Sequence, residues 1–212
     1  MVLEELRKEQ EKLASKVITE DRFHELRLIG GVDQAFPRDY AASCIVVQNF
    51  GEFDIVEKAF SLRRVDFPYI AGFLSYREGP SIISAWRKLK TKPQVLLVDG
   101  NGILHPHRIG LASHIGVLLD QPTIGVAKSL LCGEVRGSRV FVNGEARACV
   151  LQSKEGCRPI YVSPGHKVSL DSSVKIVKRC IKSHKLPEPL RLAHRFVGDF
   201  SRDICFKFPA SK

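Results

Sequence analysis

The chain has 212 residues, of which 44% are hydrophobic and 26% are charged, a composition typical of a single soluble globular domain. The net charge of +10 makes nucleic acid the leading class of partner, although many basic proteins bind no polyanion. The sequence has no CxxC pair, no apolar run near the ~18 residues of a membrane span and no signal peptide, so we expect a reduced, cytoplasmic protein without membrane association.

The first half of the chain predicts a helix followed by antiparallel strands. Residues 1–25 contain apolar side chains at helical spacing over 3–17, which indicates a helix that packs on the core. Strand-like runs follow at 27–35, 41–49 and 54–65, separated by short segments that suit hairpin turns. We therefore expect three consecutive antiparallel strands.

The second half predicts a parallel unit and more strands. Helix-like segments at 81–90 and 108–120 alternate with apolar strands at 94–100 and 123–129, and Pro80 suits the first turn of the earlier helix. Asn143-Gly144 is the clearest hairpin signal, a strand is expected at 158–166, and helices are expected at 170–184 and after Pro189. The prediction is one mixed α/β sheet flanked by helices, forming a single domain over 1–212 with a polar end at 207–212.

Four polar residues stand where a site could form. Asp33 and Asp99 each follow an apolar strand, and a carboxylate beside a core requires pairing, hydrogen bonding or a metal. Glu78 precedes the Gly-Pro dipeptide, and His194 lies on the last helix beside two arginines. Structural alternatives exist for each: the aspartates can cap turns, Glu78 can favour a helix N-terminus and His194 can be a surface residue.

The chemistry that fits these residues is metal-assisted phosphodiester hydrolysis. Carboxylate oxygens suit Mg²⁺ or Mn²⁺, and the sequence has no GxSxG, P-loop, GxGxxG or HExxH motif. Two divalent ions about 4 Å apart can activate water and stabilise a leaving oxygen. Acidic strand ends in a basic protein therefore indicate a nuclease.

Six segments carry a resemblance to a known family. They are GVDQAF around Asp33, FPYIAGFLSYREGP at 67–80, VDGNGILHPHRIGLASHIG at 98–116, PTIGVAKS at 122–129, YVSPGH at 161–166 and LPEPLRLAH at 186–194. In this order they resemble endonuclease V, whose fold is similar to ribonuclease H. The resemblance implies a ribonuclease H-like mixed sheet.

The resemblance also implies catalytic residues. Asp33, Glu78 and Asp99 would hold Mg²⁺, with Mn²⁺ able to substitute. His194 would lie near the reacting phosphate, and Lys128 would add positive charge there. The alternative for Lys128 is a surface lysine that only neutralises phosphate, which kinetics can distinguish.

Substrate-binding residues follow from the same resemblance. Tyr69 would be the wedge that replaces a base extruded into a pocket, although Ala71 stands where the family usually has a second proline. Leu74 and Gly100 would present backbone groups to that base, and His105 would line the pocket or the backbone path. The segment 163–166 matches the family as well, but the sequence assigns it no chemical role.

The function that the resemblance implies is DNA repair. The protein would recognise deoxyinosine (hypoxanthine) and hydrolyse the second phosphodiester bond on its 3′ side, leaving 3′-hydroxyl and 5′-phosphate ends. Alternatives are an inosine-specific endoribonuclease acting on RNA and a non-catalytic protein that only binds the lesion. We expect a monomer.

Overall fold

A computed structural model describes residues 2–207, so the predicted polar end lies, after its first residue, outside the described residues. The elements are α1 (Val2–Ala14), β1 (Leu28–Ala35), β2 (Tyr40–Asn49), β3 (Ile55–Arg64), α2 (Leu74–Lys88), β4 (Val95–Asp99), α3 (Leu111–Leu119), β5 (Thr123–Ala127), β6 (Glu134–Arg136), β7 (Arg139–Val142), β8 (Glu145–Leu151), β9 (Ile160–His166), α4 (Leu170–Cys180) and α5 (Glu188–Lys207).

All nine strands belong to one sheet in the order β3-β2-β1-β4-β5-β9-β8-β7-β6. The first three strands are antiparallel, as predicted, and β1, β4 and β5 are parallel neighbours. The helix α3 connects β4 to β5, which confirms the predicted parallel unit. The mixed α/β, ribonuclease H-like sheet expected from the sequence is therefore confirmed.

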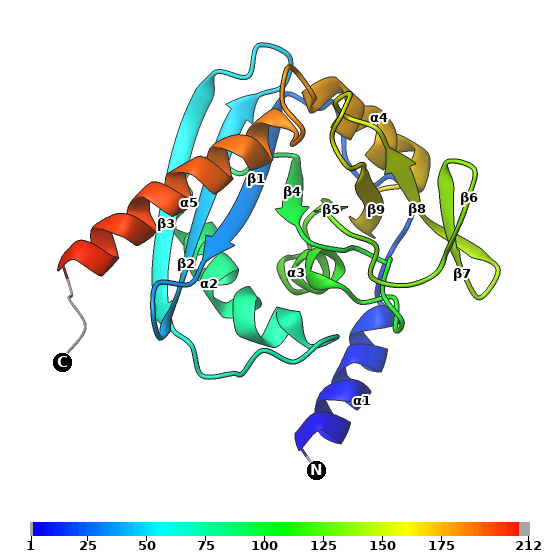
Figure 1. Ribbon diagram of the computed structural model, residues 1–212, viewed down its shortest axis with the longest axis horizontal. Helices are drawn as coiled ribbons and strands as arrows, with labels where there is room; N and C mark the ends of the chain where they lie inside the picture. The colour runs from blue at the N-terminus through cyan, green and yellow to red at the C-terminus, as the bar shows by residue number, and fades with distance from the viewer. Residues whose placement is uncertain (1, 208–212) are drawn as a thin grey trace.

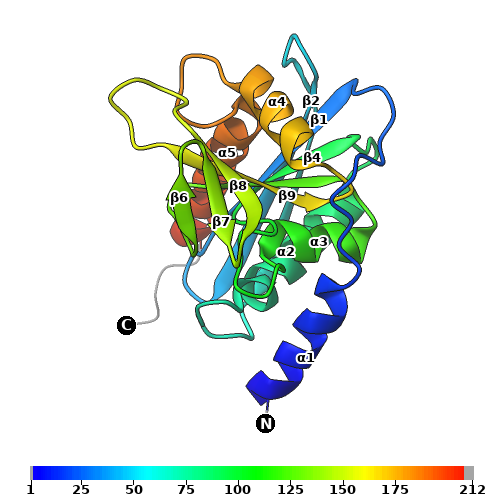
Figure 2. The same cartoon turned by 90° about the vertical axis from the view of Figure 1, so that its right-hand side faces the viewer.

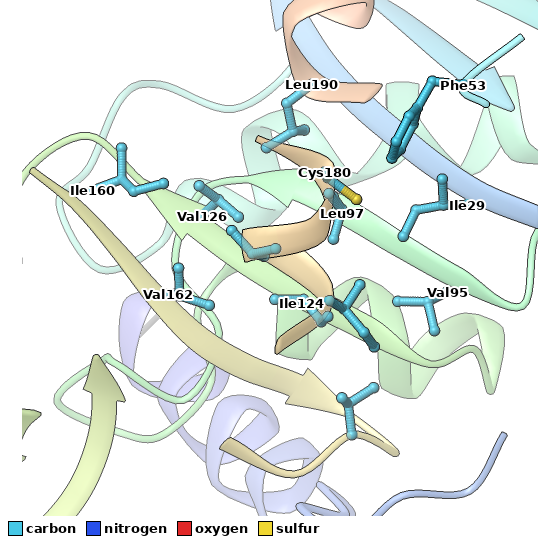
Figure 3. Packing of buried hydrophobic residues seen from close by; sticks show 13 residues of the cluster. Ile29, Phe53, Val95, Leu97, Ile124, Val126, Ile160, Val162, Cys180 and Leu190 are labelled. Carbon is cyan, nitrogen blue, oxygen red and sulfur yellow. The ribbon is translucent and has the colours of Figure 1, made fainter. Parts of the chain in front are cut away.

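Helices cover both faces of the sheet, with α4 and α5 on one face and α2 and α3 on the other (Figure 1). Because side chains alternate along a strand, one strand serves both layers. Val95 and Leu97 of β4 pack under α4 and α5, where Figure 3 shows Leu97 near Cys180, whereas Leu96 and Val98 pack under α2 and α3. The arrowheads of β1 and β4 point toward the same end of the sheet (Figure 1).

A close contact fixes the position of α5 on β1. A Cβ atom at Gly31 would lie 2.3 Å from the backbone carbon of Pro189, so only glycine permits this approach. Leu190 is buried in the core beside this contact, as Figure 3 shows. The first turn of α5 is thus set directly above the strand that ends near Asp33.

The clearest hairpin prediction is confirmed. Asn143 and Gly144 connect β7 to β8 with φ angles of 52° and 78°. Positive φ at both central residues is the turn that matches the twist of paired strands. Figure 2 shows β6, β7 and β8 side by side at one edge of the molecule.

Three boundaries differ from the predictions. The helix α2 begins at Leu74, so Pro80 lies inside it and Glu78 lies in its second turn rather than before it. The Gly-Pro dipeptide indicated a helix start, yet the helix begins earlier because its first turns pack against α3. The Tyr76 ring lies edge-on to His114, and a Cβ atom at Gly79 would lie 3.3 Å from Ile115. The first helix ends at Ala14 and α4 ends at Cys180, both earlier than predicted.

The short strand β6 was missed because Glu134–Arg136 is fully exposed and has no apolar alternation. Within residues 2–207, no helix combines the length and the apolar character needed to cross a membrane.

Candidate active site

Asp33 and Asp99 lie side by side at the carboxyl ends of adjacent parallel strands. Val32 of β1 pairs with Val98 of β4, so the next residue of each strand is an aspartate. Side chains two residues apart on a strand point to the same face of the sheet. Asp33 is two residues beyond Gly31 and Asp99 is two residues beyond Leu97, so both aspartates point to the face covered by α4 and α5. Parallel strand ends are a common location for ligand sites in α/β sheets.

Lys128 reaches the same cluster from β5. Val126 pairs with Asp99, and Lys128 stands two residues further, so its side chain leaves the sheet on the same face. Its Nζ forms an ion pair with Asp99 Oδ2. The register of β4 and β5 therefore brings Lys128 and Asp99, both singled out from the sequence, into contact.

His194 reaches the cluster from α5. It lies one helical turn after Leu190, whose backbone packs on Gly31. His194 Nδ1 is 2.6 Å from Asp33 Oδ2, and 63% of its side chain is exposed. The backbone N–H of Gln34 donates a second hydrogen bond, 2.8 Å long, to Asp33 Oδ1.

Glu78 completes the group from the opposite layer. It lies in the second turn of α2 and is only 9% exposed. Burial, followed by the charges of Asp33 and Asp99, raises the pKa of Glu78 to about 8. The three carboxylates predicted from the sequence therefore interact electrostatically.

The pKa values of Asp33 and Lys128 also shift in this environment. Burial and the charge of Asp99 raise the pKa of Asp33 to about 6, against the opposing effects of His194 and Lys128. Burial alone would lower the pKa of Lys128, but the charge and hydrogen bond of Asp99 and the charge of Asp33 raise it. The accumulated negative charge and the Lys128 ammonium thus stabilise one another.

The donor chemistry fits a divalent cation. Three carboxylates from β1, β4 and α2 repel one another, which a divalent cation would offset, and their oxygens are the ligands that Mg²⁺ and Mn²⁺ prefer. Within residues 2–207, however, no three His, Cys, Asp or Glu side chains converge closely enough to hold one ion. Instead, Lys128 and His194 contact Asp99 and Asp33 directly.

A pocket of about 110 Å³ opens beside the cluster. Its walls come from the turn before α2, the start of α2, the loop after β4 and the start of α3. The lining residues are Tyr69, Ile70, Ala71, Gly72, Leu74, Ser75, Gly100, Asn101, His105, Gly110, Leu111 and Leu131. All four predicted substrate-binding residues line this one pocket.

Gly100 joins the pocket to the carboxylates because it follows Asp99 directly. Its φ of 156° lies in a region that side chains rarely adopt, and a Cβ atom would lie 3.3 Å from Leu111. The glycine therefore permits the chain to turn from the strand into the pocket wall. Tyr69 is 73% exposed at the mouth, so it is free to contact a ligand.

His105 is held neutral within the pocket wall. Burial, followed by the charge of His107, lowers the pKa of His105 to about 4. Its Nδ1 accepts a hydrogen bond of 3.2 Å from the His107 backbone N–H, which leaves Nε2 carrying the proton. Nε2 lies on the side of Gly72, and a hydrogen bond with the Gly72 backbone opposes the lowering of the His105 pKa.

Sequence reasoning missed Arg147, which is 6% exposed and anchors the pocket wall from β8. Its Nη1 donates to the carbonyl oxygen of His105 at 2.7 Å, and its Nε donates to Glu145 at 2.8 Å. The sequence could not predict this contact, because Arg147 on β8 and His105 in the loop after β4 are 42 positions apart. Asn101 was also missed; its Oδ1 is buried without a hydrogen-bond partner among residues 2–207.

The segment 163–166, which had no assigned role, supports the loop that carries the pocket residues. Ser163 Oγ accepts a 2.8 Å hydrogen bond from the Gly102 backbone N–H, and the Pro164 carbonyl accepts one of 2.7 Å from Ile103. A Cβ atom at Gly102 would lie 1.9 Å from the Pro164 oxygen. Close packing against β9 therefore fixes the loop after β4.

Comparisons with known proteins agree with this geometry. The sequence model of the family described as Endonuclease V matches residues 11–195. Endonuclease V of Dictyoglomus thermophilum is 44% identical over 193 residues, covering 87% of this chain and 85% of that protein.

Two solved structures extend the likeness to the fold. Endonuclease V from Bacillus subtilis has a TM-score of 0.89 at 31% identity, covering 97% of this chain and 94% of its own. Endonuclease V from Ciona intestinalis, in complex with a 24-mer DNA containing an inosine followed by a ribo-adenosine, has a TM-score of 0.87 at 30% identity; the match covers 95% and 98% of the two chains. The likeness in sequence and fold spans nearly the whole length of each protein.

Proposed function

The chain belongs to the Endonuclease V family of nucleases, and on that premise we propose that it is a repair endonuclease acting on deoxyinosine in DNA. The proposed reaction hydrolyses the second phosphodiester bond on the 3′ side of the lesion and leaves 3′-hydroxyl and 5′-phosphate ends. The supporting observation is the continuity between pocket and cluster: Gly100 lines the pocket, and Asp99 directly before it belongs to the carboxylate group.

In this proposal the pocket holds the extruded hypoxanthine. Leu74, Gly100 and His105 line it, and main-chain N–H groups at Leu74 and Gly100 would donate to a 6-oxo group. Adenine carries a donor at that position, and a mismatched buried hydrogen bond costs about 1–3 kcal/mol. Exposed Tyr69 would stack on the bases that the extrusion leaves unstacked.

The cluster would carry the hydrolysis. Asp33, Glu78 and Asp99 would hold Mg²⁺, or Mn²⁺ in its place, which when bound supplies Lewis-acid activation of water and of the phosphate. Lys128, already charged beside Asp99, offsets the negative charge that develops on the phosphate. Asp33 orients His194 through Nδ1, so Nε2 can exchange a proton with the reacting groups.

A defined cleavage assay tests the proposal. The substrates are labelled duplexes carrying one deoxyinosine, one inosine in RNA, or one deoxyinosine followed by a single ribose, with a lesion-free duplex as control. Each is incubated with Mg²⁺, Mn²⁺ or chelator. We expect a metal-dependent nick at the second bond beyond deoxyinosine and no nick in the control.

The same assay tests the alternative that the protein is an inosine-specific endoribonuclease. That alternative gains support from the ribo-adenosine in the DNA bound by the Ciona intestinalis relative. Cleavage only where a ribose follows the lesion would favour the RNA enzyme and would contradict the DNA-repair proposal.

Asp99→Ala separates an enzyme from a protein that only binds the lesion. Because Asp99 contacts Lys128 and raises the pKa values of Asp33 and Glu78, its loss should abolish cleavage. Binding to the deoxyinosine duplex should persist, since Asp99 does not line the pocket. Nicking at the parental rate would contradict the assignment of the cluster.

A further inference from the structure

Two hollows adjoin the turn that carries Tyr69, on the side that precedes it in sequence. One is about 200 Å³ and the other about 240 Å³, and both are lined by Asp66, Phe67 and Arg77. Arg63 and Arg64 also line the first hollow, and Arg38 lines the second. We call these four arginines the arginine group. The residues of the turn from Tyr69 to Gly72 line the pocket of about 110 Å³ instead, so the turn lies between that pocket and the two hollows.

The arginine group has no carboxylate partner within 4 Å among the residues that the structure describes. Asp66 borders both hollows, and Asp39 borders the second. In the first hollow three arginines outnumber one aspartate, whereas in the second two arginines face two aspartates. Taken together, four guanidinium groups and two carboxylates leave the pair of hollows with excess positive charge, most of it in the first.

Two arginines of the group are held in a defined orientation. Arg38 Nη2 donates a 3.3 Å hydrogen bond to the Cys205 carbonyl oxygen. Arg77 Nη1 donates a 2.9 Å hydrogen bond to the Phe67 carbonyl, and the Arg77 guanidinium lies 4.7 Å from the centre of the Phe36 ring. A guanidinium has five N–H groups, so most remain available on its other edges. Reduced freedom before binding lowers the entropic cost of forming further hydrogen bonds.

Strand pairing brings the remaining arginines together. Tyr40 of β2 pairs with Arg64 of β3, and the Val65 N–H donates to the Asp39 carbonyl at 2.7 Å. Arg38 at the end of the β1–β2 connection thus lies close to the end of β3. The strands β2 and β3 thus fix where the segments around Arg38 and Val65 leave the sheet, although most residues that line the second hollow lie in these connecting segments.

We propose that the arginine-lined hollows bind phosphates of the nucleic-acid backbone next to the turn that carries Tyr69. They would do so on the side of this turn away from the pocket proposed to hold the extruded base. The proposal rests on the proposed function in that the protein acts on nucleic acid. Guanidinium groups bind phosphate oxygens in a bidentate manner, and two adjoining hollows can take neighbouring phosphates. Anchoring the backbone there would hold the strand while Tyr69 enters the stack.

The salt dependence of binding to lesion-free oligonucleotides tests this subsite independently of cleavage. Arg38→Gln, Arg64→Gln and the double variant are compared by fluorescence anisotropy over a KCl series. Each lost contact should make the slope of log K against log salt shallower by about 0.9 for duplex or about 0.7 for single strand. Arg77 is left unchanged because it precedes Glu78 and packs on Phe36.

Matched controls separate this site from general loss of charge. Arg87→Gln removes the same charge from an exposed position on α2 that lines neither hollow, and its slope should stay at the parental value. Arg64→Lys keeps a positive charge and should retain the slope while lowering affinity, because a lysine cannot bind bidentately.

Comparing duplex with single strand shows how much of the nucleic acid the subsite needs. A shallower slope with both substrates means that one strand is sufficient for the contact, and a shallower slope with duplex alone means that the contact requires both strands; either result supports the subsite. Slopes that match Arg87→Gln overturn it. If the parent cuts no inosine substrate while the double variant loses slope, the proposed function fails and the subsite stands.

Discussion

Lys128 and His194 each contact one aspartate of the cluster, and these contacts help three carboxylates to lie near one another. Lys128 contacts Asp99, and His194 contacts Asp33. Among residues 2–207, Glu78 has no side-chain ion pair, and its pKa is raised further than that of Asp33. Glu78 therefore keeps a proton more readily than Asp33 does, because it is buried without a hydrogen bond like that from His194.

Lys128→Met should reduce kcat and leave KM almost unchanged. The charge that it places beside Asp99 acts on the phosphate as negative charge develops, and loss of such a group costs about 10²–10³ in rate. Steady-state kinetics on the deoxyinosine duplex measure both constants. A raised KM with unaltered kcat would instead assign Lys128 to ground-state phosphate binding.

Tyr69→Ala should weaken lesion binding without changing stability. The side chain is 73% exposed, so its removal leaves no cavity, whereas lost base stacking costs about 1–3 kcal/mol. Thermal melting and binding titrations with the deoxyinosine duplex provide the two measurements. Phe206→Ala, at an 89% exposed aromatic outside the pocket, is the control and should change neither quantity.

At the scale of elements, the site depends on where α5 begins. Gly31 allows the Pro189 backbone to lie against β1, and one turn later His194 reaches Asp33. The loop after β4 depends in the same way on Gly102, which packs on Pro164. Close backbone approaches thus position the residues of the carboxylate cluster and of the pocket.

Gly31→Ala should lower both stability and activity. The new Cβ atom would require α5 to move away from β1, and overpacking of this kind costs about 1–3 kcal/mol. The same displacement would separate His194 from Asp33. Urea unfolding and cleavage rates would record the two effects.

The matched control for this substitution is Gly198→Ala on the same helix. A Cβ atom there meets nothing within 4 Å, so alanine should raise stability by about 0.5–1 kcal/mol and leave cleavage unchanged. A Gly31→Ala protein as stable and active as the parent would refute the role of the close contact.

For the whole molecule, the response to acid includes a contribution from a buried neutral histidine. Burial lowers the pKa of His114 to about 4, and its ring packs edge-on against Tyr76. At this position the unfolded chain, with a pKa near 6.5, binds a proton more readily than the folded protein. The contribution of His114 to stability is therefore complete above about pH 6.5 and is lost as the pH drops toward 4, whereas the raised pKa values of Glu78 and Asp33 act in the opposite direction.

His114→Phe should reduce this acid sensitivity. Phenylalanine keeps an aromatic ring beside Tyr76 and removes the titrating group, whose contribution is about 3 kcal/mol at most. Chemical unfolding at pH 4, 5, 6 and 7 gives the free energies. A variant curve parallel to that of the parent would contradict the prediction.

The sequence by itself determined the alternation of elements and the family. Apolar strands at β1, β4 and β5 and the Asn143-Gly144 turn depend on local periodicity and local backbone preference, so their residues were sufficient to predict them. Asp33 and Asp99 were identifiable because each follows a buried run. That they belong to one site followed from their position at strand ends. The predictions of a monomer, of one domain over 1–212 and of a bound metal stay predictions.

Only the tertiary structure decided the contacts between distant segments. The start of α2 at Leu74 depends on packing against α3, which outweighs the Gly-Pro signal before position 81. The bond from Arg147 to His105 and the arrangement of the arginine group require a hairpin and strand ends to meet loops remote in sequence. Such contacts arise from strand register and helix placement, which are properties of the whole chain and leave no pattern in neighbouring residues.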